Sequence, residues 1–147
     1  MNMDGYYLLY GIFILVITIC IIDFRIRTIP NKLLALVALL VVSHCFLYGQ
    51  VSNLIFFIPS IIVGGIVWYI GLWGAGDAKL MAILAPLIDL DYYLTTVILI
   101  LMAGGIQAII SLVALKLSDT KQPAGIAYGV SIAFGCFLGI LMTIAEV

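Results

Sequence analysis

Residues 5–22, with the sequence GYYLLYGIFILVITICII, are an unbroken apolar run, and the polar stretch DFRIRTIPNK follows them at residues 23–32. A helix needs about 20 mainly apolar residues to cross a bilayer. A cleaved secretory signal has a basic start and an apolar region of about 7–15 residues. Met1–Asp4 carries no basic residue, and the apolar run is longer than such a region. We therefore expect the first run to be a membrane-spanning helix that is retained.

Five further apolar runs follow the first one along the chain. They lie at residues 33–48, 54–73, 77–88, 92–115 and 124–145, and short polar turns separate them. Over the whole chain, 66% of the residues are hydrophobic and 9% are charged, whereas an ordinary soluble domain carries about 25% charged residues. The pattern predicts an all-α integral membrane protein, in which residues 1–147 form one bundle of six transmembrane helices.

The charged residues are sorted by the side of the membrane on which a six-span chain would place them. All basic residues fall at the first, third and fifth turns: Arg25, Arg27, Lys32, Lys79, Lys116 and Lys121. The opposite side receives only acidic residues: Asp4, Asp89, Asp91 and Glu146. Because loops rich in Lys and Arg stay in the cytoplasm, this arrangement predicts a cytoplasmic basic side and two outward-facing termini.

The net charge and the few metal-binding side chains exclude several kinds of protein. Six basic residues and a net charge of −1 provide no patch for a nucleic-acid backbone. Cys20, Cys45 and Cys136 are far apart, and His44 is the single histidine, whereas a zinc site needs several closely spaced ligands. We therefore expect no metal, no other cofactor and no nucleic acid.

Two aspartates adjoin long apolar runs on the expected cytoplasmic side. Asp23 follows the first run and Asp77 opens the fourth, whereas Asp119 lies in a polar turn and is expected to be solvated. Acidic residues next to membrane helices usually face the interior of a bundle or a wet cavity. If the two helices touch, the two carboxylates meet and share one proton, as in aspartic proteases. The alternative for Asp77 alone is a helix N-cap.

The residues before the second acid form the pattern Gly74-Ala75-Gly76-Asp77. Glycine allows a backbone to approach closely and to adopt positive φ. An unwound substrate could therefore lie against Gly74 and Gly76 and hydrogen-bond to them as an added strand. The pattern predicts a substrate-binding edge beside the acid.

Three stretches of the sequence resemble motifs of the prepilin peptidases, membrane aspartyl proteases that trim type IV pilin-like precursors. DFRIRTIPN at residues 23–31 is similar to the D-x-R-x-x-x-IPN segment of that family, and GAGDAKL at residues 74–80 is similar to its GxGDxKL segment. IAYGVSIAFG at residues 126–135 resembles its last-helix PYG-type segment. The resemblance covers the chain in order and spacing, and it implies that Asp23 and Asp77 are the catalytic pair.

The chain departs from the family pattern at two places. Ala127 stands where the last-helix motif usually has proline, although Tyr128 and Gly129 are kept. Residues 23–32 form the whole first loop, whereas larger bifunctional members carry a cysteine-rich insertion there and also N-methylate the new terminus. The chain is therefore similar to the short peptidase-only members of tight-adherence (Flp-type) pilus systems, and methyl transfer is not expected.

Other residues of these motifs have both a functional and an ordinary interpretation. Arg25 anchors the loop at lipid headgroups or contacts the substrate leader. Lys79 extends to the membrane interface or influences the proton of the aspartate pair. Pro30 and Asn31 are expected to shape the start of the second helix. Tyr128 is either a donor to a substrate carbonyl or an interfacial tyrosine.

The resemblance implies an endopeptidase in a bacterial cytoplasmic membrane that removes a short, basic, cytoplasmic leader from pilin or pseudopilin precursors. Two alternatives stay open. One is a presenilin-like protease with other membrane substrates. The other is a non-enzymatic protein, either a small transporter whose two acids bind a cation or relay protons or a subunit of an export machine. The sequence leaves the oligomeric state and the individual precursor open.

Overall fold

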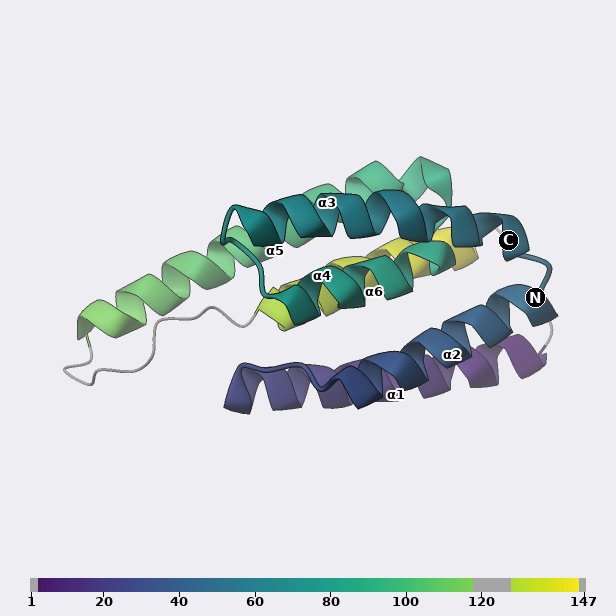
Figure 1. Cartoon of the computed structure of the whole chain (residues 1–147), viewed down its shortest axis with the longest axis horizontal. Coiled ribbons are helices and arrows are strands. Elements are labelled where there is room, and N and C mark those ends of the chain that lie inside the picture. Colours follow the sequence, from purple (N-terminus) through teal and green to yellow (C-terminus); the bar gives the residue numbers. More distant parts are fainter. Residues whose placement is uncertain (1–2, 118–127, 146–147) are drawn as a thin grey trace.

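The computed structural model describes residues 3–117 and 128–145, and over these residues the chain consists of helices joined by short turns (Figure 1). The elements are, in chain order, α1 (Met3–Ile26), α2 (Asn31–Leu47), η1 (Val51–Phe56), α3 (Phe57–Tyr69), α4 (Ala75–Leu84), η2 (Ala85–Leu87), α5 (Leu90–Leu117) and α6 (Tyr128–Ala145). The two elements marked η are short 3-10 helices. The predicted all-α class is confirmed, whereas the predictions for Asp119, Lys121, Ala127 and Glu146 fall outside the described residues.

Four helical segments of the described chain are long and apolar enough to cross a bilayer: Tyr7–Ile26, Val51–Tyr69, Leu90–Val113 and Tyr128–Ala145. The chain is thus a multi-pass membrane protein by the composition of its helices. α4 has 10 residues, so it is about 15 Å long, or half of the roughly 30 Å hydrocarbon thickness. The prediction of six helices is confirmed, but the prediction of six membrane spans is not.

The fourth apolar run is divided because of Pro86. Proline has no backbone N–H and cannot continue the ladder of an α-helix. α4 therefore ends at Leu84, and the chain continues as the 3-10 turn Ala85–Leu87 before Ile88 becomes extended. The result is a short helix where the sequence alone suggested a span.

Two helix ends also differ from the predicted positions. α1 continues to Ile26, so Asp23 lies inside the helix and not in the loop after it. Arg27, with φ 55°, ends this helix, and its N–H donates to the carbonyl of Asp23 at 2.8 Å. α3 ends at Tyr69, before the predicted end at Trp73.

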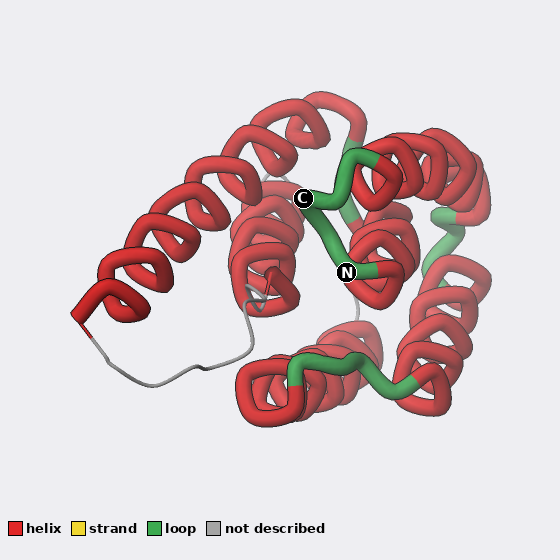
Figure 2. The backbone as a smooth tube through the Cα atoms, turned by 60° about the vertical axis from the view of Figure 1, so that its left-hand side comes forward, coloured by secondary structure: helices red, strands yellow, loops and turns green. Residues whose placement is uncertain are grey.

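The helices run alternately in opposite directions, and α4 and α6 occupy the middle of the bundle (Figure 1). α4 packs on α3, α6 and α2, and α6 packs on α5, α1 and α4. Figure 2 shows the same bundle from another direction, with the helices gathered around this middle pair. One end of the bundle, at the left in Figure 1, thus collects the ends of α1, α3 and α5 and the starts of α2, α4 and α6.

The charges of the described residues follow this arrangement. The helix ends at the left of Figure 1 carry the basic residues Arg25, Arg27, Lys32, Lys79 and Lys116. The other end carries Asp89, directly before α5, and Asp91 in the first turn of that helix. The separation of charge predicted from the sequence is therefore present in the fold, and we call the left end of Figure 1 the basic end.

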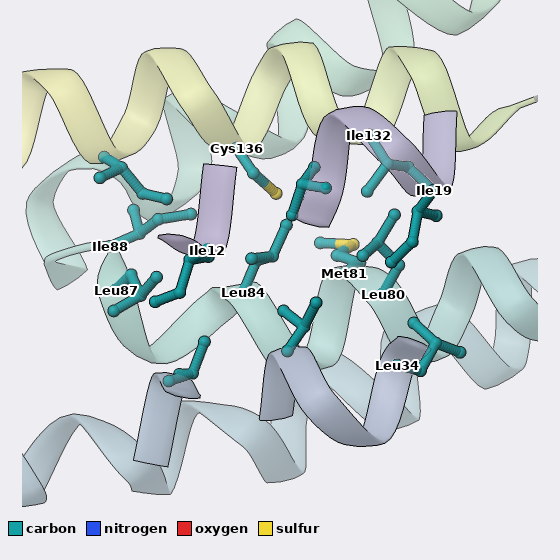
Figure 3. Close-up of a cluster of buried hydrophobic side chains, with 14 of the residues drawn as sticks. Ile12, Ile19, Leu34, Leu80, Met81, Leu84, Leu87, Ile88, Ile132 and Cys136 are labelled. Carbon is teal, nitrogen blue, oxygen red and sulfur yellow. The ribbon is translucent and has the colours of Figure 1, made fainter. Parts of the chain in front are cut away.

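The core lies where α1 and α2 meet the middle pair of helices. Figure 3 shows side chains such as Ile12, Ile19, Leu80 and Ile132 converging there, and each of these four is fully buried. α4 is largely enclosed, with six of its residues buried: Asp77, Ala78, Leu80, Met81, Ala82 and Leu84. Its enclosure explains how a polar side chain in its first turn is removed from solvent.

A close helix contact fixes the position of α4. A Cβ atom added at Gly64 of α3 would lie 3.0 Å from the Cα atom of Ala78. Small residues allow this kind of approach between the backbones of membrane helices. Because Ala78 directly follows Asp77, the contact also fixes the position of that carboxylate along the length of the bundle.

Candidate active site

Asp23 lies in the last turns of α1 and is 5% exposed. Its Oδ2 atom accepts a hydrogen bond from the backbone N–H of Gly129 at 3.2 Å. Gly129 is the second residue of α6, where backbone N–H groups have no partner within the helix and favour a negative charge. A Cβ atom at Gly129 would lie 2.7 Å from the same oxygen, so a larger residue would force the Asp23 carboxylate to move.

Asp77 lies in the first turn of α4 and is 6% exposed. Its Oδ2 atom accepts a hydrogen bond at 2.9 Å from the N–H of Gly74, the residue that caps the helix. This is the reaching-back contact of a capping box. The alternative that Asp77 is the N-cap residue is wrong, because Gly74 takes that position and Asp77 is the third residue of the helix. Its Oδ1 atom is buried and has no hydrogen-bond partner within the part of the chain that the structure describes, which is rare for a native polar atom.

The two carboxylates come from helices that share neighbours. α1 and α4 each pack against α2 and α6, so these two shared helices, and not an extended contact between α1 and α4, bring the acids to the same region. The side chain of Ile29 lies between the first turns of α4 and α6, within 3.4 Å of the places that Cβ atoms would take at Gly76 and Gly129. The fold therefore brings the two predicted acids to one place at the basic end.

The electrostatics of Asp77 are those of a carboxyl that resists ionisation. This residue lies outside the four candidate spans. Burial raises its pKa from 3.8 to about 6, the hydrogen bond from Gly74 opposes that shift, and the negative charge of Asp23 raises the pKa further. The influence of Asp23 is the behaviour expected of two like charges at one site.

The glycines before Asp77 have a different immediate role from the predicted one. Gly74 donates its N–H to the carboxylate, and the face of Gly76 is covered by Ile29, whose Cβ atom lies 2.8 Å from the position of an added Cβ. Gly74 has an extended backbone with φ −76° and ψ 156°. In this structure the segment therefore holds the acid and receives Ile29, whereas a substrate strand along Gly76 would first have to displace that side chain.

Lys79 and Asn31 join the two motifs that carry the acids. The Nζ atom of Lys79 donates to the Oδ1 atom of Asn31 at 3.1 Å, and the pair is exposed. Pro30 is the N-cap residue of α2, and its carbonyl accepts the N–H groups of Leu33 and Leu34. Pro30 and Asn31 thus begin α2 as predicted, and the contact between Asn31 and Lys79 is an additional finding.

The side chains of Arg25 and Tyr128 lie in different surroundings. Arg25 is exposed and lines a groove of about 480 Å³ together with Ile17, Cys20, Ile21, Phe24 and Val130. The ring of Tyr128 lies over Gly104 of α5, 2.7 Å from the place of an added Cβ. The tyrosine is thus packed between α5 and α6.

Sequence reasoning missed two contributors to the site. Ile29 is part of the quoted first motif, but its apolar side chain gave no signal of where it would point. Cys20 was considered only as a possible zinc ligand, whereas its Sγ atom donates to the carbonyl of Gly129 at 3.7 Å. Its position three residues before Asp23 on a helix was the available signal, because residues at this spacing share a face.

A comparison with protein-family models adds independent evidence. The model of the type IV leader peptidase family matches residues 10–112. The chain belongs to this family. The match includes both acids and both motifs around them, and it makes the chain an aspartic-type peptidase of the type IV leader peptidase kind. It ends before α6, so the role of Gly129 follows from the structure alone.

Members of this family act on pilin precursors in general, and they are membrane peptidases. Neither a curated protein nor a solved structure matches the sequence significantly. Among the described residues, no group of three or more His, Cys, Asp or Glu side chains lies close enough to hold a metal ion. The site itself contains two carboxyl groups, each of which accepts a hydrogen bond from an N–H group at a helix start.

Proposed function

We propose that this protein is a membrane aspartyl endopeptidase that removes the short basic leader from type IV pilin-like precursors, with Asp23 and Asp77 as its catalytic pair. The observation that carries the proposal is the buried Oδ1 atom of Asp77, which has no hydrogen-bond partner among the described residues although Oδ2 is hydrogen-bonded. An unpaired buried acceptor is costly, and a proton shared with Asp23 would satisfy it.

The proposed reaction uses one proton shared by the two carboxyl groups. The ionised carboxylate takes a proton from a water molecule, and the protonated carboxyl donates its proton to the oxygen of the scissile carbonyl. The water oxygen bonds to the carbonyl carbon, the bond between carbon and nitrogen then breaks, and the leaving amine receives a proton from the pair. The raised pKa of Asp77 supports its role as the protonated partner.

The surroundings of Asp23 suit a substrate that stays in the membrane. The groove lined by Ile17, Ile21, Phe24 and Val130 has mainly apolar walls and lies beside the turn that carries Asp23. The apolar stem of a precursor begins directly after the cleaved bond, so it must lie within a few residues of the pair. We place the stem along this groove between α1 and α6.

The charge arrangement supports a cytoplasmic position for the proposed reaction. Arg25, Arg27, Lys32 and Lys79 lie at the end of the bundle that also holds the acids, and loops rich in basic residues stay in the cytoplasm. We accordingly place the protein in a bacterial cytoplasmic membrane with its termini outside. The short loop between α1 and α2 favours a peptidase-only enzyme of an Flp-type pilus system, without methyl transfer.

The deciding experiment is a cleavage assay in membranes. The wild type is produced together with a pilin-like precursor, and Asp23→Asn and Asp77→Asn variants are produced in the same way with equal insertion verified. We expect the wild type to shorten the precursor and each variant to leave it intact. Cleavage by either variant at the wild-type rate would eliminate the two-aspartate protease and favour the transporter or structural alternatives.

A further inference from the structure

The loop between α1 and α2 places one apolar side chain between the two helix starts of the site. The Cβ, Cγ1 and Cδ1 atoms of Ile29 lie 2.8, 3.3 and 3.4 Å from the position that a Cβ would take at Gly76 of α4. Its Cδ1 atom is also 3.4 Å from the corresponding position at Gly129 of α6. Ile29 therefore fills the space between α4 and α6 at their first turns.

Each carboxylate is bound to one of these helix starts. Asp23 accepts the N–H of Gly129, so its position depends on the start of α6. Asp77 belongs to α4 and accepts the N–H of Gly74 at the start of that helix. A shift of the start of α4 relative to α6 would therefore move one carboxylate relative to the other.

The loop that carries Ile29 is restrained by the two residues that follow it. Proline disfavours the helical conformation of the residue before it, and the carbonyl of Pro30 also accepts hydrogen bonds from the first turn of α2. Asn31 accepts a hydrogen bond from Lys79 of α4. These contacts hold the isoleucine in place against the glycine faces.

We propose that Ile29 is a positioning residue that sets the separation of Asp23 and Asp77 by acting as a spacer between Gly76 and Gly129. This inference rests on the proposed function, because the spacing matters only if the pair is catalytic. It also explains why glycine is required at Gly76: an added methyl group would meet the Cβ atom of Ile29, which cannot rotate away. Only a change that removes the Cβ atom of Ile29, Ile29→Gly, should then make room for that methyl group, whereas Ile29→Ala keeps the clashing atom.

The test is a double-mutant cycle of Ile29→Gly and Gly76→Ala, with Ile29→Ala measured beside it, read as kcat and KM for precursor cleavage and as the melting temperature of the purified protein. A misplacement of about 1 Å at an active site can lower a rate on the order of 100-fold. We expect each single change to lower kcat about 10- to 100-fold with KM nearly unchanged. In the Ile29→Gly background, Gly76→Ala should cost less than about threefold, because the clashing Cβ atom is gone and residues in contact do not behave additively.

Matched controls separate spacing from general damage. A Cβ added at Gly65 of α3 meets nothing within 4 Å, and Ile26 is 67% exposed at the end of α1. Gly65→Ala and Ile26→Ala should retain the wild-type kcat. Ile29→Val, which keeps the branched Cβ atom, should restore most of the rate lost in Ile29→Ala, an effect that altered amounts of folded protein would not produce.

Two results would overturn the inference. One is an equal cost of Gly76→Ala in both backgrounds, and the other is an Ile29→Ala variant with wild-type kcat and an unchanged pH profile. Failure of the wild type to cleave any precursor would instead overturn the proposed function. The melting temperatures would in that case still test the contact between Ile29 and Gly76. If the two changes lowered the melting temperature additively, the two residues would not constrain each other.

Discussion

The two ends of the bundle each hold an aspartate near a helix start, but the two residues have different surroundings. At the end opposite the basic residues, Asp89 directly precedes α5, its Oδ1 atom accepts from Asn53 at 3.4 Å, and its N–H donates to Thr143 at 3.0 Å. At the basic end, Asp77 is buried and one of its oxygens has no partner among the described residues. Asp89 thus hydrogen-bonds within the fold, whereas Asp77 leaves an acceptor that the proposed proton sharing would use.

The glycines of α6 show the same difference along one helix. Gly129 at the basic end donates to Asp23. Gly139, nearer the other end, is covered by Thr96 of α5, and an added Cβ would meet the hydroxyl and lie 3.2 Å from the Cβ atom of that threonine. One glycine therefore binds a carboxylate, and the other allows two helices to pack.

The largest expected effect is a difference in cleavage rate between variants of Asp77 and of Asp89. Replacing Asp77 by asparagine removes the proton that the pair must share, so we expect cleavage to fall at least about 1000-fold, a loss of about 4 kcal/mol in transition-state stabilisation. Asp89→Asn should stay within about threefold of the wild type. Initial rates of precursor cleavage at equal enzyme amounts measure both. A comparable loss in Asp89→Asn would remove the distinction between the two ends.

The second prediction concerns the pH dependence of Asp77. Its pKa of about 6 in the folded protein, against 3.8, means that the folded state binds more protons, so the free energy of unfolding falls as pH rises from about 4 to 6. Asp77→Asn should remove this loss. Its free energy of unfolding should therefore exceed that of the wild type by on the order of 3 kcal/mol above pH 6 and equal it near pH 4. Thermal unfolding at several pH values in one detergent measures the difference.

The other end supplies the control for that measurement. Thr143→Val removes the acceptor of the Asp89 N–H and should lower the free energy of unfolding by about 1–2 kcal/mol at every pH.

The pH dependence of activity follows from the same residue. In the proposed mechanism the protonated form of Asp77 is required, so kcat/KM of the wild type should fall as pH rises through about 6. A flat rate profile would contradict a shared proton.

A third prediction compares the two glycines of α6. In Gly129→Ala the added methyl group would press on the Asp23 carboxylate, and we expect kcat to fall about 30-fold, or about 2 kcal/mol. Gly139→Ala should lower the melting temperature, because the methyl group meets Thr96, while the rate per folded molecule is kept. Measuring both quantities for both variants would reveal whether catalysis and packing are separated along this helix. An equal loss of rate would show that they are not.

The smallest effect is expected at the exposed contact between Lys79 and Asn31. Solvent-exposed polar pairs contribute less than about 1 kcal/mol, and Lys79→Met keeps the apolar stem of the side chain. We expect a loss of rate of about two- to fivefold through a looser loop. A 100-fold loss would show that the lysine itself takes part in the reaction.

Much of this site could be predicted from residue types and their order. The apolar runs predict a helical membrane protein, and the two motifs identify Asp23 and Asp77 as well as the start of α2 at Pro30 and Asn31. The number of spans was not predictable in the same way. Hydrophobicity measures preference for an apolar environment, and the interior of a bundle satisfies the short helix α4 as well as lipid does.

The sequence by itself determined the class of the protein, the two acids and the sorting of charge, because each of these depends on residue chemistry and on local spacing. Only the tertiary structure decided which groups surround the acids. Gly129 is 106 residues from Asp23 in the chain, and Ile29 meets Gly76 and Gly129 across two helix interfaces. Contacts of this kind arise from the packing of whole helices, which no local pattern of residues encodes.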